Sequence, residues 1–165
     1  MTTTFVFPAK MKLPESIKPV LRPLGLLRGP DIETYRQLAD YIEKHAGYLS
    51  QVTLYTYVKA RAGTQFPKMF ENEMFLTSLK IARWHIFGAA VADMALFAAA
   101  QFHVAGDLDR PDTQRFATGI IEAILTNYEQ DDVAPSVFLE MMADGVRRAA
   151  FANWGDIADG PAAFQ

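Results

Sequence analysis

The sequence predicts an all-α fold, a single four-helix bundle-like domain with a central alanine-rich helix and an extended proline-rich N-terminal arm. Apolar residues recur at helical spacing in four segments, and no alternating or parallel-sheet pattern is present. One of these segments indicates a central helix. Between Ile86 and Ala100 every residue is apolar except Gly88 and Asp93, and the bulky side chains point in all directions around the helix. Such a helix needs cover on every side.

The same segment is also the only candidate for a membrane span. A span needs about 20 apolar residues, whereas this run is interrupted at Gln101. Asp93 near its middle would cost roughly 3 kcal/mol in a bilayer. We therefore expect a buried helix of a soluble protein and no membrane span.

Composition limits the class of protein. The chain has 165 residues, half of them hydrophobic, and no cysteine, which excludes disulfides, thiolate catalysis and Cys-ligated metals. Residues 1–30 carry five basic residues and one acidic residue, whereas the whole chain has a net charge of −3. An acidic body with a short basic arm does not suit nucleic-acid binding. Since the first residues lack the apolar core of a signal peptide, we expect a cytoplasmic protein.

The domain division follows from the prolines. Prolines at positions 8, 14, 19, 23 and 30 prevent a long helix at the N-terminus, yet apolar residues recur between them. We therefore predict an extended arm at residues 1–29 that docks on its own domain or on a neighbouring subunit. The helical domain is predicted at residues 30–155, and an irregular Gly/Ala/Asp-rich tail at residues 156–165.

The first helix is expected to begin with Asp31 as its N-cap and to end before Gly63. Eight of its side chains fall within a sector of roughly 160°, which predicts that this sector faces the interior. They are Leu38, Tyr41, Ile42, His45, Tyr48, Leu49, Val52 and Tyr55.

The remaining helices follow from the same spacing. The second is predicted from about Met69 to Ala105, with a surface-exposed start and a buried second half. The third follows the turn-forming residues 106–112. The fourth is expected to be capped at Asp131 and Asp132, with Pro135 in its first turn, where proline is tolerated.

No motif for catalysis or metal binding is present. The chain lacks paired Glu-x-x-His sequences, His-Glu-x-x-His, a Gly-x-Ser-x-Gly elbow and a phosphate-binding loop. We therefore assign no catalytic residue, expect no metal or cofactor, and leave open whether the protein is an enzyme.

Asp93 is the polar residue that the pattern singles out. Because it lies in a segment that must be covered, the sequence predicts a buried carboxyl group hydrogen-bonded to Tyr48 or His45 of the first helix. A structural role and a role as acid or base remain alternatives.

Two functions are consistent with these observations. The first is protein–protein association, in which residues 1–29 engage a second copy or a larger assembly. The alternative is a binding protein or enzyme for a small apolar ligand, with a pocket between the first two helices. That pocket would be lined by Tyr41, His45, Tyr48 and Asp93.

Overall fold

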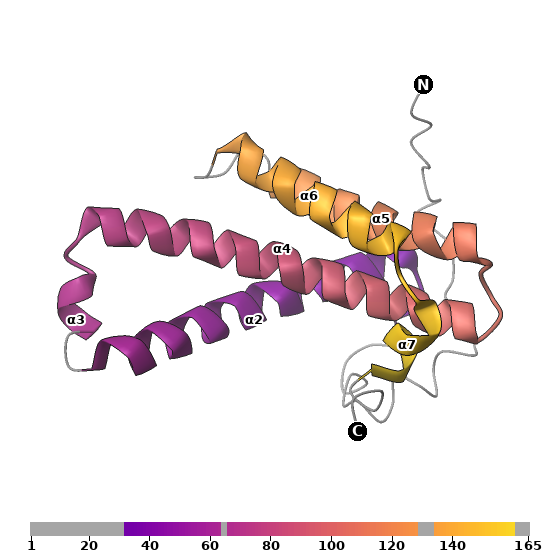
Figure 1. Ribbon diagram of the computed structural model, residues 1–165, viewed down its shortest axis with the longest axis horizontal. Helices are drawn as coiled ribbons and strands as arrows, with labels where there is room; N and C mark the ends of the chain where they lie inside the picture. The colour runs from indigo at the N-terminus through magenta and orange to yellow at the C-terminus, as the bar shows by residue number, and fades with distance from the viewer. Residues whose placement is uncertain (1–31, 64–65, 129–133, 161–165) are drawn as a thin grey trace.

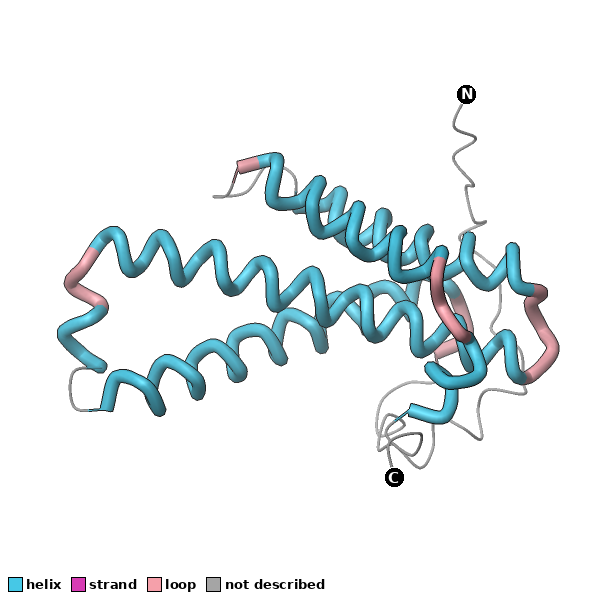
Figure 2. Tube along the Cα trace, viewed as in Figure 1, coloured by secondary structure: helices cyan, strands magenta, loops and turns pink. Residues whose placement is uncertain are grey.

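The computed structural model describes residues 32–63, 66–128 and 134–160, and it confirms the all-α class. Within these ranges the chain forms helices joined by short loops, with no strand (Figure 2). The first two long helices form a hairpin that projects well beyond the others (Figure 1).

Helix α2 (Tyr35–Ala62) begins and ends at specific capping residues. Thr34 is the N-cap: its hydroxyl accepts a hydrogen bond from the amide of Gln37, and the Gln37 side chain accepts one from the amide of Thr34. The predicted cap, Asp31, lies outside the described residues. Gly63 ends the helix with a φ of 52°, a left-handed conformation that glycine adopts without strain.

Helix α4 (Glu73–Val104) is the centre of the fold, as predicted. It follows the single turn of α3 (Phe66–Met69) and starts at Asn72, whose side chain accepts a hydrogen bond from the amide of Phe75 at 3.1 Å. Its first turn therefore lies four residues later than the predicted start at Met69. Helices α2, α5, α6 and α7 all pack against α4.

The helices of the C-terminal half of the chain cover α4. Helix α5 (Arg110–Leu125) is capped by Asp109 and continues into the short helix η3 (Thr126–Tyr128). Helix α6 (Pro135–Ala150) begins with Pro135 in its first turn, as expected, whereas Asp131 and Asp132 lie outside the described residues.

The predicted irregular tail is partly wrong, because Trp154–Asp159 form helix α7. This short helix is held against α4 by the buried ring of Trp154 and by the Gln101 side chain, which donates to the carbonyl of Ala158 at 2.9 Å. Residues 161–165 of that tail lie outside the described part of the chain.

The core lies where α4, α5 and α6 meet. Phe116, Phe138 and Ile120 are among its largest fully buried side chains. Gly88 lets α6 approach α4 closely, since a Cβ atom built there would lie 2.3 Å from the sulfur of Met141. A larger residue at position 88 would therefore require the Met141 side chain to move.

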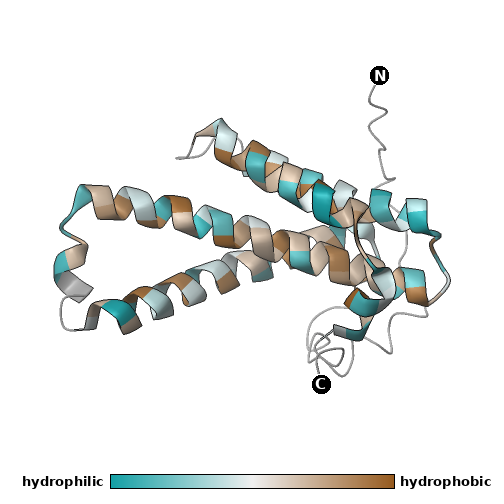
Figure 3. Cartoon of the chain, viewed as in Figure 1, coloured by the Kyte–Doolittle hydropathy of each residue, from teal (hydrophilic) through white to brown (hydrophobic). Residues whose placement is uncertain are grey.

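Apolar residues also continue along the projecting half of the hairpin, where fewer helices cover them (Figure 3). Most of the large hydrophobic side chains exposed in the described residues belong to this region: Tyr48, Leu49, Val52, Tyr55, Tyr57, Phe70, Met74 and Ile81. A two-helix hairpin cannot bury more than the faces that its helices turn to each other.

Among the described helices, α4 is the one that is long and apolar enough to cross a membrane. However, 56% of its most apolar window is buried inside the fold. The central helix of a soluble protein meets the same criterion, so this finding is weak evidence for a span.

Candidate functional site

Helix α2 has an inner and an outer face, and the structure divides the predicted 160° sector between them. The buried side chains of the inner face follow one another at intervals of four or eight residues: Leu38, Ile42, Ala46, Ser50 and Val58. The outer residues Tyr48 and Tyr55 are 69% and 54% exposed. The prediction that the whole sector faces the interior is therefore wrong, because a single neighbouring helix covers only a narrow stripe of α2.

The outer face carries a regular pattern that we call the outer seam. Its six residues are separated alternately by four and three positions, which is the spacing of the a and d positions of a coiled coil. At about 100° per residue they fall within roughly 80° of one another. The outer seam consists of Tyr41, His45, Tyr48, Val52, Tyr55 and Lys59.

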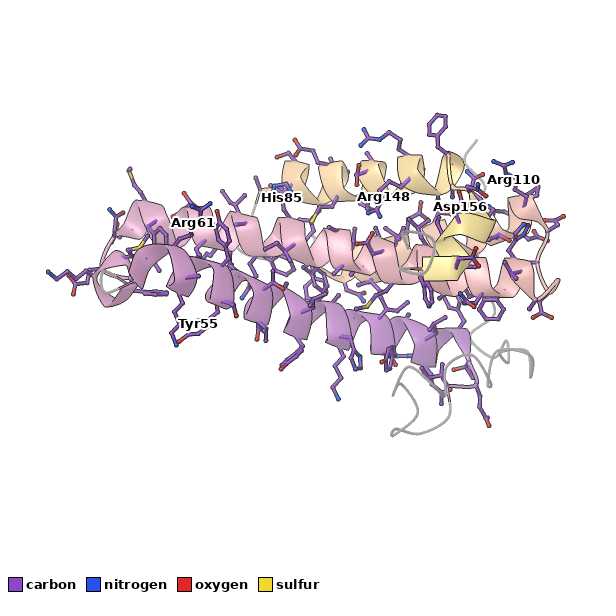
Figure 4. The ribbon with its side chains drawn as sticks, turned by 60° about the horizontal axis from the view of Figure 1, so that its bottom comes forward. Tyr55, Arg61, His85, Arg110, Arg148 and Asp156 are labelled. Atoms are coloured by element: carbon purple, nitrogen blue, oxygen red, sulfur yellow. The ribbon has the colours of Figure 1, made fainter. Side chains whose placement is uncertain are left out.

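The first two residues of the outer seam are more buried than those that follow. Tyr41 and His45 are half-buried, whereas Tyr48, Val52 and Tyr55 are exposed. Tyr55 points away from α4 (Figure 4). The exposed part of the outer seam therefore presents aromatic and β-branched side chains directly to solvent.

Tyr41 and His45 are in direct contact. Their rings stack with centroids 3.8 Å apart, and Nδ1 of His45 donates to the carbonyl oxygen of Tyr41 at 2.8 Å. This hydrogen bond leaves Nε2 as the ring nitrogen that can meet an incoming partner. Partial burial raises the pKa of Tyr41 above its usual value.

The prediction for Asp93 is wrong. Its side chain is 64% exposed and forms an ion pair with Arg148 of α6, not a hydrogen bond with Tyr48 or His45. Figure 4 labels Arg148 on α6, the helix that packs on the other side of α4 from α2. The run around Asp93 is buried on most sides, but Ala89 and Asp93, one turn apart, share an uncovered strip.

The four residues of the predicted pocket therefore do not form one site. Tyr41 and His45 lie together, Tyr48 is exposed one turn further along α2, and Asp93 is paired with α6. A cleft between α2 and α4 does exist, with a volume of about 430 Å³, but it lies towards the free end of the hairpin. Its walls are formed by Gln51, Val52, Leu54, Tyr55, Val58, Phe70, Leu79 and Arg83.

This cleft adjoins the outer seam. Val52 and Tyr55 belong to both features, so one partner that lies along the seam also covers the cleft. Leu54 and Val58 fall outside the sector that the sequence singled out, and Phe70 and Leu79 come from other elements. A stripe on one helix cannot reveal walls that a second helix contributes.

A second cavity of similar volume lies at the opposite end of α4, beside α7, and includes His103 and Arg110. Nδ1 of His103 lies 3.1 Å from the carbonyl of Leu108 and 3.3 Å from the hydroxyl of Thr113. These contacts hold the turn between α4 and α5. Within the described residues, no three His, Asp or Glu side chains gather as a metal site would require.

Comparisons with known proteins assign no relative to the chain. No family model matches it, and no curated protein or solved structure matches it significantly. The fold and the outer seam together define a helical protein in which one face of α2 packs on α4 and a second face, with coiled-coil spacing, is partly exposed.

Proposed function

We propose that this protein functions through protein–protein association and that the outer seam of α2 is its contact surface. The observation that supports this proposal is the exposure of a seam with alternating four- and three-residue spacing on a helix whose other face is already packed. Full burial of a large apolar side chain contributes about 1.5–3 kcal/mol relative to exposure. Tyr48, Val52 and Tyr55, which are 69%, 43% and 54% exposed, still offer much of that contribution to a partner.

The packing of α2 on α4 supports the proposal further. A helix held by its inner face cannot rotate to bury its outer face, so the outer seam keeps its direction until another molecule covers it. A knob-into-hole partner for such a seam is another helix. The contact surface proposed here is therefore helical and already positioned, which reduces the entropy lost on binding.

The predicted N-terminal arm, residues 1–29, lies outside the described residues. Its role in association stays a prediction, as does the cytoplasmic location. The outer seam offers a contact surface that does not depend on the arm.

A photo-crosslinking amino acid at Val52 tests the proposal in cells that produce the full chain. We expect illumination to give an adduct of higher mass, because Val52 would lie within the contact. Thr53 is the matched control, since it is exposed on the same helix but lies outside the outer seam. Absence of an adduct from position 52, or equal adducts from both positions, would contradict association through this surface.

The cleft supports a second candidate function, the binding of a small apolar ligand. Its volume of about 430 Å³ lies within the range of roughly 300–1,000 Å³ typical of ligand sites. Its walls are mainly apolar, with Gln51 and Arg83 as the polar groups that could orient a ligand. Binding of an apolar fluorescent dye that Leu79→Trp abolishes would support this function, whereas equal dye binding by the variant would contradict it.

A further inference from the structure

We infer that the cleft between α2 and α4 binds an anionic amphiphile, a long-chain carboxylate whose alkyl chain fills the cleft and whose head group pairs with Arg83. This inference rests on the second candidate function, since it assumes that the cleft is a ligand site. It adds the chemical class of the ligand and the direction in which the ligand lies.

The two polar residues that we assigned to orient a ligand, Gln51 and Arg83, lie at the same end of the cleft. Helices α2 and α4 run antiparallel, so a residue well before the end of α2 lies beside one well after the start of α4 (Figure 1). Gln51 precedes the end of α2 at Ala62 by 11 residues, and Arg83 follows the start of α4 at Glu73 by 10 residues. Given the rise of an α-helix, each lies about 15 Å along its helix from the turn that joins the two.

The cleft becomes apolar towards the free end of the hairpin. Val58 and Leu79 lie closer to the turn than Gln51 and Arg83 do, and Phe70 belongs to the turn itself. Burial of an alkyl chain against such walls is favourable in proportion to the apolar area removed from water. The cleft therefore has a polar end and an apolar end, which matches a molecule with a polar head and an alkyl chain.

Arg83 is the one charged residue among the described residues of the cleft wall, and its guanidinium group is open to a ligand. The side chain is exposed, and its guanidinium carbon lies 5.1 Å from the centre of the buried Trp84 ring. Within the described part of the chain, no Asp or Glu forms an ion pair with Arg83. Contact with the ring positions the cation without neutralising it. A guanidinium group in this state binds a carboxylate through two parallel hydrogen bonds.

The charge of the hairpin favours an anionic head group over a cationic one. Residues 51–85 contain five basic residues and two carboxylates, a net charge of +3, although the whole chain has a net charge of −3. The two carboxylates, Glu71 and Glu73, lie at the turn and at the start of α4, which is the end of the cleft opposite Arg83. A carboxylate head beside Arg83 is therefore separated from both acidic side chains of the hairpin.

The size of the cleft favours a free single-chain molecule over a lipid of a bilayer. Its volume of about 430 Å³ lies towards the lower end of the range of roughly 300–1,000 Å³ typical of ligand sites. One alkyl chain suits this space better than the two chains of a phospholipid. Because the walls come from two helices that pack together, the cleft receives a molecule that enters it and not a flat surface.

Calorimetric titration of the full-length chain with decanoate tests the inference. We expect one decanoate per chain, and for Arg83→Gln an affinity lower by about tenfold, because a charge-assisted pair is lost. Decanol has the same alkyl chain without the charge and should bind the natural chain and Arg83→Gln equally. Since Arg83 is exposed, the variant should keep the helical circular-dichroism spectrum of the natural chain.

Arg61→Gln is the matched control for Arg83→Gln. The guanidinium carbon of Arg61 also lies over an aromatic ring, 5.6 Å from the centre of Tyr57, but Arg61 does not line the cleft. The Arg61→Gln protein should therefore bind decanoate as tightly as the natural chain does. An equal loss of affinity in both variants would assign the effect to the general charge of the hairpin and overturn the pairing with Arg83.

Three further results would overturn the inference. They are absence of decanoate binding, equal decanoate affinity of Arg83→Gln and the natural chain, and decanoate binding that Leu79→Trp leaves unchanged. Dye binding that Leu79→Trp abolishes would in each case preserve the cleft as a site for an uncharged apolar ligand. Binding to phosphatidylglycerol vesicles without binding of decanoate would identify a bilayer as the source of the anionic lipid, which also contradicts a free carboxylate.

Discussion

Arg148 of α6 forms an ion pair with Asp93, the one carboxylate in the apolar part of the central helix α4. The side chains of Arg148 and Asp93 are 35% and 64% exposed, so water screens the interaction. Asp93 therefore needs no buried partner, and α4 remains at the centre of the fold because its other faces are covered.

The exposure of this pair predicts a small contribution to stability. Replacement of Asp93 by Asn or by Ala should each lower the free energy of unfolding by less than about 1 kcal/mol, as is typical of surface ion pairs. Urea denaturation of the two variants and of Arg148→Ala measures this. A loss above about 2 kcal/mol for Asp93→Ala would contradict the exposed position of the carboxylate, because such losses accompany buried charges.

Replacement by alanine of two glycines in the long helices should change the stability of the protein in opposite directions. Gly88→Ala should destabilise the protein by about 1–3 kcal/mol, because the new Cβ would overlap the Met141 side chain. Gly47 has no neighbour within 4 Å of an added Cβ. Gly47→Ala should therefore stabilise the protein by up to about 1 kcal/mol through helix propensity.

Thermal and urea unfolding of both variants provide the comparison, with Gly47→Ala as the control for intrinsic propensity. Equal stabilisation by the two substitutions would show that α6 does not approach α4 at Gly88. Destabilisation by Gly47→Ala would contradict the open surroundings of that position.

Tyr35 predicts how stability depends on alkaline pH. Burial raises the pKa of its hydroxyl well above the usual value of 10.0, and the charge of Glu122 raises it further. Above about pH 10 the unfolded chain releases a proton that the folded chain keeps. The free energy of unfolding should therefore fall as the pH rises above 10.

Tyr35→Phe isolates this effect, because it keeps the ring that packs edge-on against Phe116 with centroids 5.6 Å apart. Urea unfolding at pH 8.5 and pH 10.5 should show a smaller loss of stability for the variant than for the natural chain. Tyr41, whose pKa is also raised, should leave part of the pH dependence in place. An identical loss in both proteins would rule out Tyr35 as its source.

The all-α class and the central helix could be predicted from the sequence because they follow from local pattern. A run such as residues 86–100 needs cover wherever its neighbours come from. Gly63 and Pro135 likewise act through their own backbone conformation, and both lie where they were expected. Helix α7 was missed because it is stabilised by contacts of Trp154 with α4, which is far away in the sequence. The Gly- and Asp-rich segment itself carries no local pattern that indicates a helix.

The candidate site was harder to predict because periodicity does not tell which of two apolar faces is covered. Helix α2 has apolar residues on both, and Leu38 and Tyr48 fell in one broad sector of the projection although they point to different surroundings. The position of Asp93 posed the same difficulty. Whether Arg148 lies near depends on how α6 crosses α4, which residues on α4 alone do not determine.

Size-exclusion chromatography of extracts from cells that produce the natural chain or one of two charge variants tests the central claim most directly. Association through the outer seam predicts that the natural chain and Thr53→Glu elute above the mass of one chain, 18.4 kDa. Val52→Glu should elute as a single chain, and after purification it should keep the helical circular-dichroism spectrum of the natural chain, because it places a charge within the contact. Elution of Val52→Glu at the same mass as the natural chain would contradict association through the outer seam.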